Sequence, residues 1–593
     1  MDTKAKLAAL RSVMAQLKID AYLIPSNDPH QSEYVAPHWQ SRTWMSGFTG
    51  SYGVLIITMH KADLWTDSRY FIQAEQELKD SGIAMKKLEA GKPDYNHWLI
   101  NNLKNGDTLG VDGQLLSKDQ YQRLRKKLAP ANIHINYKYD LIKAIWADRP
   151  TLPDDLIYEH AHPYPALSRM EKIDLVRQEM QALRVNAYPI TKLDDIAWLL
   201  NLRGQDVDFN PVFIAYFLLF EKEAYLFIHP EKVPALIRES LEADSIKIKA
   251  YHDFQAYFGF LQKPTKVLIE PTLSIPYFNQ IDASCCIYHQ GLVESLKAIK
   301  HPKELDFIRS TMIKDGVALT RFYKWLDEKE DITELNEYQL SEQLNAFRAQ
   351  DESYVGESFP AIVGFQSNAA VVHYRPQQEH SKTLETLGML LVDSGGQYQS
   401  GTTDITRTIT IGTPTTEQKE TFTQVLKGHI ELAMIQFPTG TTAGQLDLLA
   451  RKHLWQSGRN YGHGTGHGVG YFLNVHEGPA SISPAVNSAR GRQILQVGMI
   501  LSNEPGYYKP GEYGIRTENL ICVQASAHEG FLKMETLSLF PIDQRLIAID
   551  LMTRAEIQWL NSYHQQVFNR LSPHLSAEEQ TWLREKCLAF ELD

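Results

Sequence analysis

A helix-then-strand pattern near the start of the chain returns 166 residues later, and this repeat constrains the fold more than any other sequence feature. Residues 10–24 read LRSVMAQLKIDAYLI, and residues 176–190 read VRQEMQALRVNAYPI. The shared positions are Arg11, Met14, Leu17, Ala21, Tyr22 and Ile24, matched by Arg177, Met180, Leu183, Ala187, Tyr188 and Ile190. Two amphipathic helices could match by chance, but this match continues from helical spacing into an apolar strand-like run. We therefore predict two copies of one α/β domain.

A second match supports the duplication and helps to place the domain boundaries. Residues 44–50 (WMSGFTG) resemble residues 198–204 (WLLNLRG), and the proline-containing segment 148–154 (DRPTLPD) reads as a linker. Further on, two C-terminal helices are predicted from capping-box sequences that begin at Thr553 and Ser576. We predict three domains, at residues 1–148, 149–297 and 298–593, with a C-terminal extension of the third from about residue 530.

Charge and targeting patterns exclude several classes of protein. Lys and Arg number 60 and Asp and Glu number 71, so the net charge of −11 lacks the basic footprint of a dedicated nucleic-acid binder. The N-terminus does not read as a signal peptide, and no apolar run approaches about 18 residues, so we expect no membrane span. Four cysteines without a C-x-x-C pair are too sparse for a disulfide scaffold. We expect a reduced, cytoplasmic protein.

Two similar segments in the third domain carry the candidate chemistry. Residues 388–398 (GMLLVDSGGQY) and 498–508 (GMILSNEPGYY) each read as an apolar strand that opens with Gly-Met and ends in an acid and a glycine turn. Each is followed by a second predicted strand with its own acid, so we expect two β-hairpins with two carboxylates apiece. The acids of the first strands are Asp393 and Glu504, and those of the second strands are Asp404 and Glu518.

Acids on facing strands of a hairpin can point into one cavity. Four carboxylates gathered there repel one another and need cations, and oxygen ligands suit hard divalent ions such as Mn²⁺. A nitrogen ligand is offered by His467 in residues 461–470 (YGHGTGHGVG). His463 and His467 are four residues apart, as in a zinc-protease helix, but the glutamate is missing and alternating glycines disfavour a helix. We therefore expect a loop or strand here, with His373, His463 and His476 flanking the ligand strands.

Six motifs in this domain resemble those of the pita-bread metallopeptidases, and within them those of the three-domain aminopeptidase P family. They are residues 364–374 (GFQSNAAVVHY), 392–396 (VDSGG), 401–407 (GTTDITR), 462–468 (GHGTGHG), 502–506 (SNEPG) and 514–518 (GIRTE). Residues 27–34 and 65–70 resemble the family's N-terminal domain, and residues 531–561 resemble its C-terminal extension. The resemblance implies a mixed α/β and α+β chain, with two related creatinase-like α/β domains before a pita-bread catalytic domain.

The resemblance also implies a site with two divalent metal ions per subunit, and Mn²⁺ is the ion we expect. Asp393 and Asp404 would bind one ion, and His467 and Glu504 the other, with Asp404 and Glu518 bridging. The family's substrate contacts match His373, His476 and the N-domain residue Arg69, besides His467 and Glu504. Three further side chains, His463, Tyr508 and Arg516, would support the ligands from outside.

The activity implied is release of the N-terminal residue from short peptides with proline in the second position, through a hydroxide shared by two metal ions. Glu504 would act as the base, with His373 and His476 at the developing oxyanion. Three domains favour this enzyme over prolidase, which takes dipeptides, and over methionine aminopeptidase. Intact ligands argue against creatinase and against a non-catalytic pita-bread binding module. By resemblance we also expect a homodimer.

Overall fold

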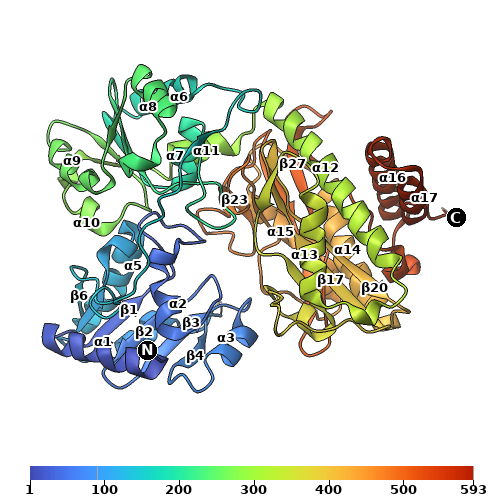
Figure 1. Cartoon of the computed structure of the whole chain (residues 1–593), viewed down its shortest axis with the longest axis horizontal. Helices are drawn as coiled ribbons and strands as arrows, with labels where there is room; N and C mark the ends of the chain where they lie inside the picture. Colours follow the sequence, from blue (N-terminus) through green and yellow to red (C-terminus); the bar gives the residue numbers. More distant parts are fainter. Residues whose placement is uncertain (90, 592–593) are drawn as a thin grey trace. The chain divides into compact units, whose positions relative to one another are not determined.

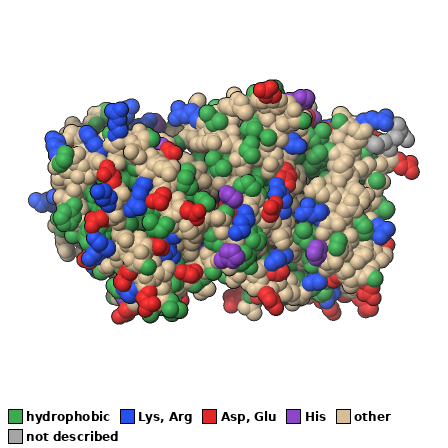
Figure 2. Space-filling view, turned by 90° about the horizontal axis from the view of Figure 1, so that it is seen from above, with side chains coloured by type: hydrophobic (Ala, Val, Ile, Leu, Met, Phe, Trp, Pro, Cys, Tyr) green, Lys and Arg blue, Asp and Glu red, His purple; other side chains and the backbone are tan. Residues whose placement is uncertain are grey.

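The computed structural model describes residues 1–89 and 91–591, which divide into two compact units. The first unit holds Met1–Ala161 and Leu167–Val293, drawn from blue to green in Figure 1. The second holds His162–Ala166 and the chain from Glu294 onward, drawn mainly from yellow-green to red. On the face shown in Figure 2, acidic and basic side chains are interspersed. Among the described residues, no helix is both long enough and apolar enough to cross a bilayer.

The first unit contains two six-stranded sheets with the same topology. The first sheet has the order β4-β3-β2-β1-β5-β6 and the second β12-β11-β10-β8-β13-β14. The strands of the first are β1 (Ala21–Ile24), β2 (Val54–Thr58), β3 (Ala62–Thr66), β4 (Ala84–Lys87), β5 (Thr108–Val111) and β6 (His134–Asn136). Those of the second are β8 (Ala187–Ile190), β10 (Tyr216–Phe220), β11 (Ala224–Phe227), β12 (Ile246–Lys249), β13 (Val267–Ile269) and β14 (Cys286–Tyr288). Corresponding strand pairs also run in the same relative directions, so the predicted duplication is confirmed.

The repeated residues have equivalent structural roles in the two sheets. Helices α1 (Thr3–Leu17) and α6 (Arg169–Ala182) each precede the central strand and bury the same stripe, which is Leu7, Leu10 and Met14 in one and Ile173, Val176 and Met180 in the other. The matched arginines are equivalent too. Arg11 donates to the carbonyl of Thr58 at 2.9 Å, and Arg177 to that of Phe220 at 3.3 Å. Both carbonyls belong to the residue paired with the first residue of the central strand.

The other helices of this unit are short. They are α2 (Ser41–Ser46), α3 (Phe71–Glu77), α4 (Tyr95–Asn102), α5 (Lys118–Leu128), α7 (Leu193–Leu200), α8 (Ala235–Ala243), α9 (Phe254–Tyr257) and α10 (Ile275–Phe278), followed by α11 (Leu292–Ala298) at the boundary with the second unit. The matched tryptophans lie on α2 and α7, so this part of the repeat is also helical in both copies.

The second unit is built around two sheets, β16-β17-β20 and β21-β28-β27-β24-β22-β23. Their strands are β16 (Ile362–Phe365), β17 (Gly388–Ser394), β20 (Ile405–Ile411), β21 (Gln436–Pro438), β22 (Gly466–Gly468), β23 (Glu477–Ile482), β24 (Ile500–Asn503), β27 (Asn519–Ala525) and β28 (Phe531–Thr536). The helices of this unit are α12 (Pro302–Asp327), α13 (Glu337–Arg348), α14 (Thr416–Met434), α15 (Asp447–Gln456), α16 (Arg554–Leu571) and α17 (Ala577–Lys586). Figure 1 shows the long helix α12 and the C-terminal pair α16 and α17.

The two Gly-Met strands form as predicted, but the strands after them differ from the prediction. A small hairpin of β18 (Gly396–Tyr398) and β19 (Gly401–Thr402) follows β17, and one of β25 (Gly506–Lys509) and β26 (Tyr513–Arg516) follows β24. The chain breaks from strand geometry at Asp404 and at Glu518 before it returns as β20 or β27. Each predicted second strand is therefore divided into two strands. At the acid, the chain stops pairing with one strand and begins to pair with another.

The C-terminal helices begin at the predicted capping boxes. In each, the N-cap hydroxyl accepts from the backbone of a glutamate three residues on, whose carboxylate accepts in return. The apolar stripe of α16 includes Leu560, Tyr563 and Val567, and these side chains are buried in the core of the second unit. In the described chain, this stripe therefore packs on its own unit.

Candidate metal centre

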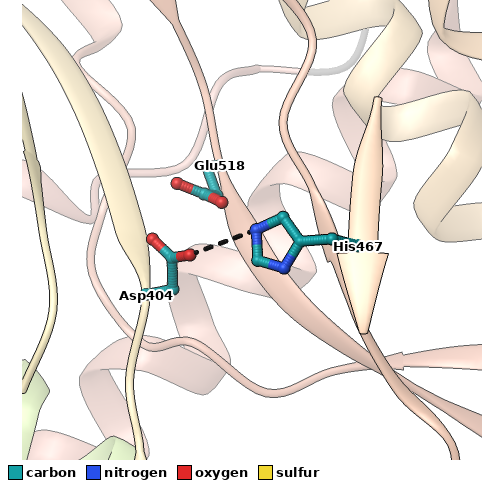
Figure 3. Close-up of side chains that lie close together, drawn as sticks. All are labelled: Asp404, His467 and Glu518. Atoms are coloured by element: carbon teal, nitrogen blue, oxygen red, sulfur yellow. Dashed lines mark ion pairs between the residues drawn. The ribbon is translucent and has the colours of Figure 1, made fainter. Parts of the chain in front are cut away.

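The five predicted ligands come from strands of both central sheets of the second unit. Asp393 lies in β17, Asp404 directly before β20, Glu504 directly after β24 and Glu518 directly before β27. The fifth predicted ligand, His467, lies in β22, which pairs with β24. Figure 3 shows Asp404, His467 and Glu518 pointing toward one another, and their ligand atoms all lie within 4.8 Å of each other.

His467 presents one ring nitrogen to the acids. Its Nε2 lies 3.5 Å from Oδ2 of Asp404 and 3.6 Å from Oε1 of Glu504. Its Nδ1 is 2.9 Å from the carbonyl oxygen of Gly468, which can only accept, so Nδ1 carries the proton. The neutral ring then has its lone pair on Nε2, which is the form that binds metals.

Glycines explain why β22 can approach its neighbours so closely. A Cβ added to Gly466 would lie 2.0 Å from the carbonyl oxygen of Ser502, and one on Gly468 would lie 2.3 Å from that of Glu477. Any side chain at these positions would push the strand outward. The alternating glycines thus permit a tightly packed strand, in agreement with the prediction that this segment is not a helix.

Burial and mutual repulsion of the carboxylates favour the binding of cations at this centre. Burial raises the pKa of Asp404 well above its usual value, and the charges of Asp393 and Glu504 raise it further. Burial, followed by the charge of Asp404, has the same effect on the pKa of Glu518. Burial also raises the pKa of Glu504. In addition, Oδ1 of Asp393 is buried without a hydrogen-bond partner among residues 1–89 and 91–591. Clustered carboxylate oxygens and one imidazole therefore fit hard divalent ions well.

The three predicted supporting residues form one connected chain. His463 Nε2 lies 2.8 Å from the Tyr508 hydroxyl, and Arg516 Nη1 donates to that hydroxyl at 2.5 Å. Arg516 Nη2 then donates to Oδ2 of Asp393 at 2.6 Å. Arg516 is 2% exposed, so this contact joins a buried guanidinium to a buried carboxylate. This hydrogen-bond network holds Oδ2 of Asp393 and leaves Oδ1 free to bind a ligand.

The predicted substrate-contact residues are placed differently from one another. The His476 ring meets that of His467 edge to face, with centroids 4.3 Å apart. His373 follows the short helix η9 (Gln366–Ala370), which packs against β26 at Gly514. Arg69 belongs to the first unit, where it makes a bidentate contact with Asp67 at 2.9 and 2.7 Å.

Sequence reasoning missed two hydroxyl residues that contact the predicted ligands. Thr406 Oγ1 donates to Oε2 of Glu518 at 2.7 Å. Ser502 Oγ lies 3.3 Å from Oε1 of Glu504 and accepts from the backbone N–H of His467 at 3.0 Å. Both lie two residues from a predicted ligand and inside its sequence motif, Thr406 in residues 401–407 and Ser502 in residues 502–506. Their closeness in sequence to the acids was the signal that could have identified them.

Comparisons with known proteins define the class of the chain. The model for metallopeptidase family M24 matches residues 306–525, and the model for the C-terminal region of that peptidase matches residues 530–590. Two models for the creatinase/prolidase N-terminal domain match residues 6–138 and 148–304. These matches describe an M24 metallopeptidase preceded by two creatinase-type domains.

Relatives with similarity over the full length narrow the class. A probable Xaa-Pro aminopeptidase P of Laccaria bicolor is 38% identical over 99% of this chain and 94% of its own length. Xaa-Pro aminopeptidase 1 of Dictyostelium discoideum is 36% identical over 96% of this chain and 93% of its own. The crystal structure of a cytosolic X-prolyl aminopeptidase from Caenorhabditis elegans, described as having a di-nuclear active site, matches with a TM-score of 0.95 at 32% identity over 100% of both chains. The chain belongs to the Xaa-Pro aminopeptidase family of metalloexopeptidases, as predicted.

Proposed function

We propose that this enzyme releases the N-terminal residue from short peptides whose second residue is proline. The convergence of Asp404, His467 and Glu518 on one point, with Glu504 beside them, is the observation that carries the proposal. Full-length similarity to Xaa-Pro aminopeptidases supports the choice of substrate.

The residues present fit two divalent ions, and we infer that Mn²⁺ is the ion used. Asp393 and Asp404 would hold one ion and His467 and Glu504 the other, with Asp404 and Glu518 shared between them. When bound, such ions lower the pKa of a coordinated water so that a nucleophile exists at neutral pH. The carboxylate-rich ligand set favours Mn²⁺ over softer metals.

Glu504 is the group we assign to proton transfer. Burial raises the pKa of its carboxyl group above the usual value, and a carboxylate beside the nucleophile can serve as a general base. Glu504 would accept a proton from the attacking water and deliver it to the proline nitrogen as that nitrogen leaves. The imide nitrogen carries no hydrogen before cleavage, so recognition must come from the shape of the ring.

The histidines would act on the substrate carbonyl. His476 lies against His467, and we infer that His476 and His373 donate hydrogen bonds to the oxyanion or orient the peptide. We further propose that Arg69 contacts the substrate, that the enzyme is cytoplasmic like its described nematode relative, and that it is a homodimer.

One assay series tests the proposal. The metal-stripped enzyme is titrated with Mn²⁺, and hydrolysis is measured for an Xaa-Pro dipeptide and an Xaa-Pro-Xaa tripeptide. We expect Mn²⁺-dependent cleavage of the tripeptide. Preference for the dipeptide would favour a prolidase-type enzyme, and absence of both metal binding and cleavage would favour a non-catalytic binding module.

A second assay tests the assigned base. Glu504→Ala should abolish cleavage of a bradykinin-like Arg-Pro-Pro peptide. Residual activity above about a tenth of wild type would contradict this role, because general-base catalysis contributes roughly 10²- to 10⁴-fold.

A further inference from the structure

A buried arginine joins the C-terminal extension to the strand that begins after Glu518. Arg407 lies in β20, is 3% exposed, and makes six hydrogen bonds with its guanidinium group. Two of them, from Nη1, reach the backbone carbonyls of Glu518 at 2.7 Å and Thr406 at 2.9 Å. The other four acceptors are Asn519 Oδ1 at 2.8 Å, the Tyr563 hydroxyl at 2.9 Å, and the carbonyls of Phe540 at 2.6 Å and Pro541 at 3.1 Å.

The network continues from Arg407 to the strand that precedes Glu504. The side-chain amide of Asn519 contacts His429 Nε2 at 3.2 Å, and His429 Nδ1 contacts the carbonyl of Asn503 at 3.0 Å. Asn503 in turn donates from its amide to the carbonyl of His429 at 2.9 Å. Asn503 and Asn519 are cross-strand partners in β24 and β27. Each is the immediate chain neighbour of a proposed metal ligand.

All six acceptors of Arg407 are neutral oxygens, and among the described residues none of its hydrogen bonds reaches a carboxylate. A buried charge without a counter-ion is costly. The neutral oxygens around Arg407 therefore stabilise its charge in place of an ion pair. The Arg407 guanidinium connects backbone groups from three segments, which are β20, the break before β27 and the C-terminal extension. It therefore constrains the chain at Glu518 directly, and at Glu504 through Asn519 and His429.

We propose that Arg407 is a positioning residue for the metal ligands, and that Tyr563 of α16 acts with it. The C-terminal extension then has a role in the site, because it supplies three of the six oxygens that orient Arg407. Thr406 adds to this arrangement, since its hydroxyl bonds to the Glu518 carboxylate while its carbonyl accepts from Arg407. The inference rests on the proposed function, in which Glu504 and Glu518 bind metal.

Three variants of the full-length enzyme separate positioning from general stability. Arg407→Lys keeps the charge but loses the planar fork of donors. Tyr563→Phe removes one hydroxyl from the network and keeps the ring. Arg203→Lys is the matched control, because Arg203 is also fully buried and donates to backbone carbonyls, those of Ala197 at 3.0 Å and Leu202 at 2.9 Å. Arg203 and both acceptors belong to the first unit, so the variant makes the same chemical change outside the proposed network.

Mn²⁺ binding to the metal-stripped proteins is followed by electron paramagnetic resonance, alongside kcat, KM and melting temperature. We expect Arg407→Lys to weaken Mn²⁺ binding by about 10-fold or more and to lower kcat with little change in KM. Tyr563→Phe should weaken binding by roughly 2- to 5-fold, as loss of one hydrogen bond implies. The Arg203 variant should bind Mn²⁺ like wild type even if its melting temperature falls.

Wild-type Mn²⁺ affinity in both Arg407→Lys and Tyr563→Phe would overturn the inference, whatever their melting temperatures. If Arg407→Lys does not fold, Tyr563→Phe decides by the same criterion. Failure of the proposed function gives a different result, because the wild-type protein itself would then bind no Mn²⁺ and cleave no Xaa-Pro peptide.

Discussion

Arg516 donates to one oxygen of Asp393 at 2.6 Å, while the other oxygen of Asp393 is buried without a partner among the described residues. A buried acceptor with no donor costs free energy unless a ligand satisfies it. The pair therefore combines a fixed carboxylate with a buried oxygen that is available to a metal ion. This arrangement is what a ligand and its support require.

Arg516→Lys should lower kcat/KM by about 10- to 100-fold, because lysine cannot contact Asp393, Tyr508 and Thr406 at once. Steady-state kinetics on a proline-second tripeptide measure this. Arg348→Lys is a matched control, since Arg348 is also buried and holds Asp315 through two bonds, at 2.8 and 3.2 Å. The control should lose stability but keep activity in the folded fraction. Equal activity of both variants would contradict a role for Arg516 in the site.

Gly466→Ala should remove Mn²⁺ binding and activity, because its Cβ would lie 2.0 Å from the carbonyl of Ser502 and force β22, with His467, away from the acids. Gly464→Ala provides the comparison within the same motif. The nearest atom to its Cβ is 3.4 Å away, so this variant should retain most activity. Calorimetric Mn²⁺ titration and peptide hydrolysis distinguish the two. Similar behaviour of both variants would show that close packing at residue 466 is not needed.

The metal-free enzyme should lose stability as the pH rises above the ordinary carboxyl range. Burial and neighbouring acids raise the folded-state pKa of Asp404 and Glu518, so the folded form holds protons that the unfolded chain has already released. Stability is then greatest below the unfolded pKa and falls as the pH increases toward the folded pKa. Asp404→Asn removes one of these ionisable groups. In chelator at pH 8.5, the variant should therefore be more stable than wild type by about 1–2 kcal/mol. Melting curves recorded in chelator at pH 8.5 measure the difference. A variant less stable than wild type would contradict the prediction.

Metal binding should release protons for the same reason. The ligands must be deprotonated to bind, and burial and mutual repulsion raise the pKa values of Asp404 and Glu518. Mn²⁺ affinity should therefore decrease as the pH is lowered from 8 to 6. Calorimetry in buffers of different ionisation enthalpy counts the released protons. Glu431→Gln offers a control, because this acid belongs to a separate cluster with His453 and Glu556. Binding heats independent of the buffer would exclude coupled proton release.

Much of the fold was predictable because it is recorded in local patterns. The repeat of residues 10–24 at 176–190 predicted two related domains, and the buried stripes of α1 and α6 occupy equivalent positions. The Gly-Met strands were also predictable, since β17 and β24 are apolar segments closed by an acid and a turn. These features depend on side-chain periodicity within a few residues of one another.

The breaks at Asp404 and Glu518 were not predictable in the same way. Each acid lies where the chain changes its pairing partner, and pairing between distant strands leaves no signature in the intervening residues. The same holds for Arg407, whose six acceptors are spread from residue 406 to residue 563.

By itself, the sequence determined the repeated domain, the set of candidate ligands and the family to which the chain belongs, because residue identity and short-range spacing carry that information. Only the tertiary structure decided which nitrogen of His467 faces the acids, which hydroxyls and guanidinium groups hold the carboxylates, and that α16 packs on its own unit. Those features arise when segments more than 100 residues apart come within hydrogen-bond distance, as in the pairs Arg516–Asp393 and Thr406–Glu518.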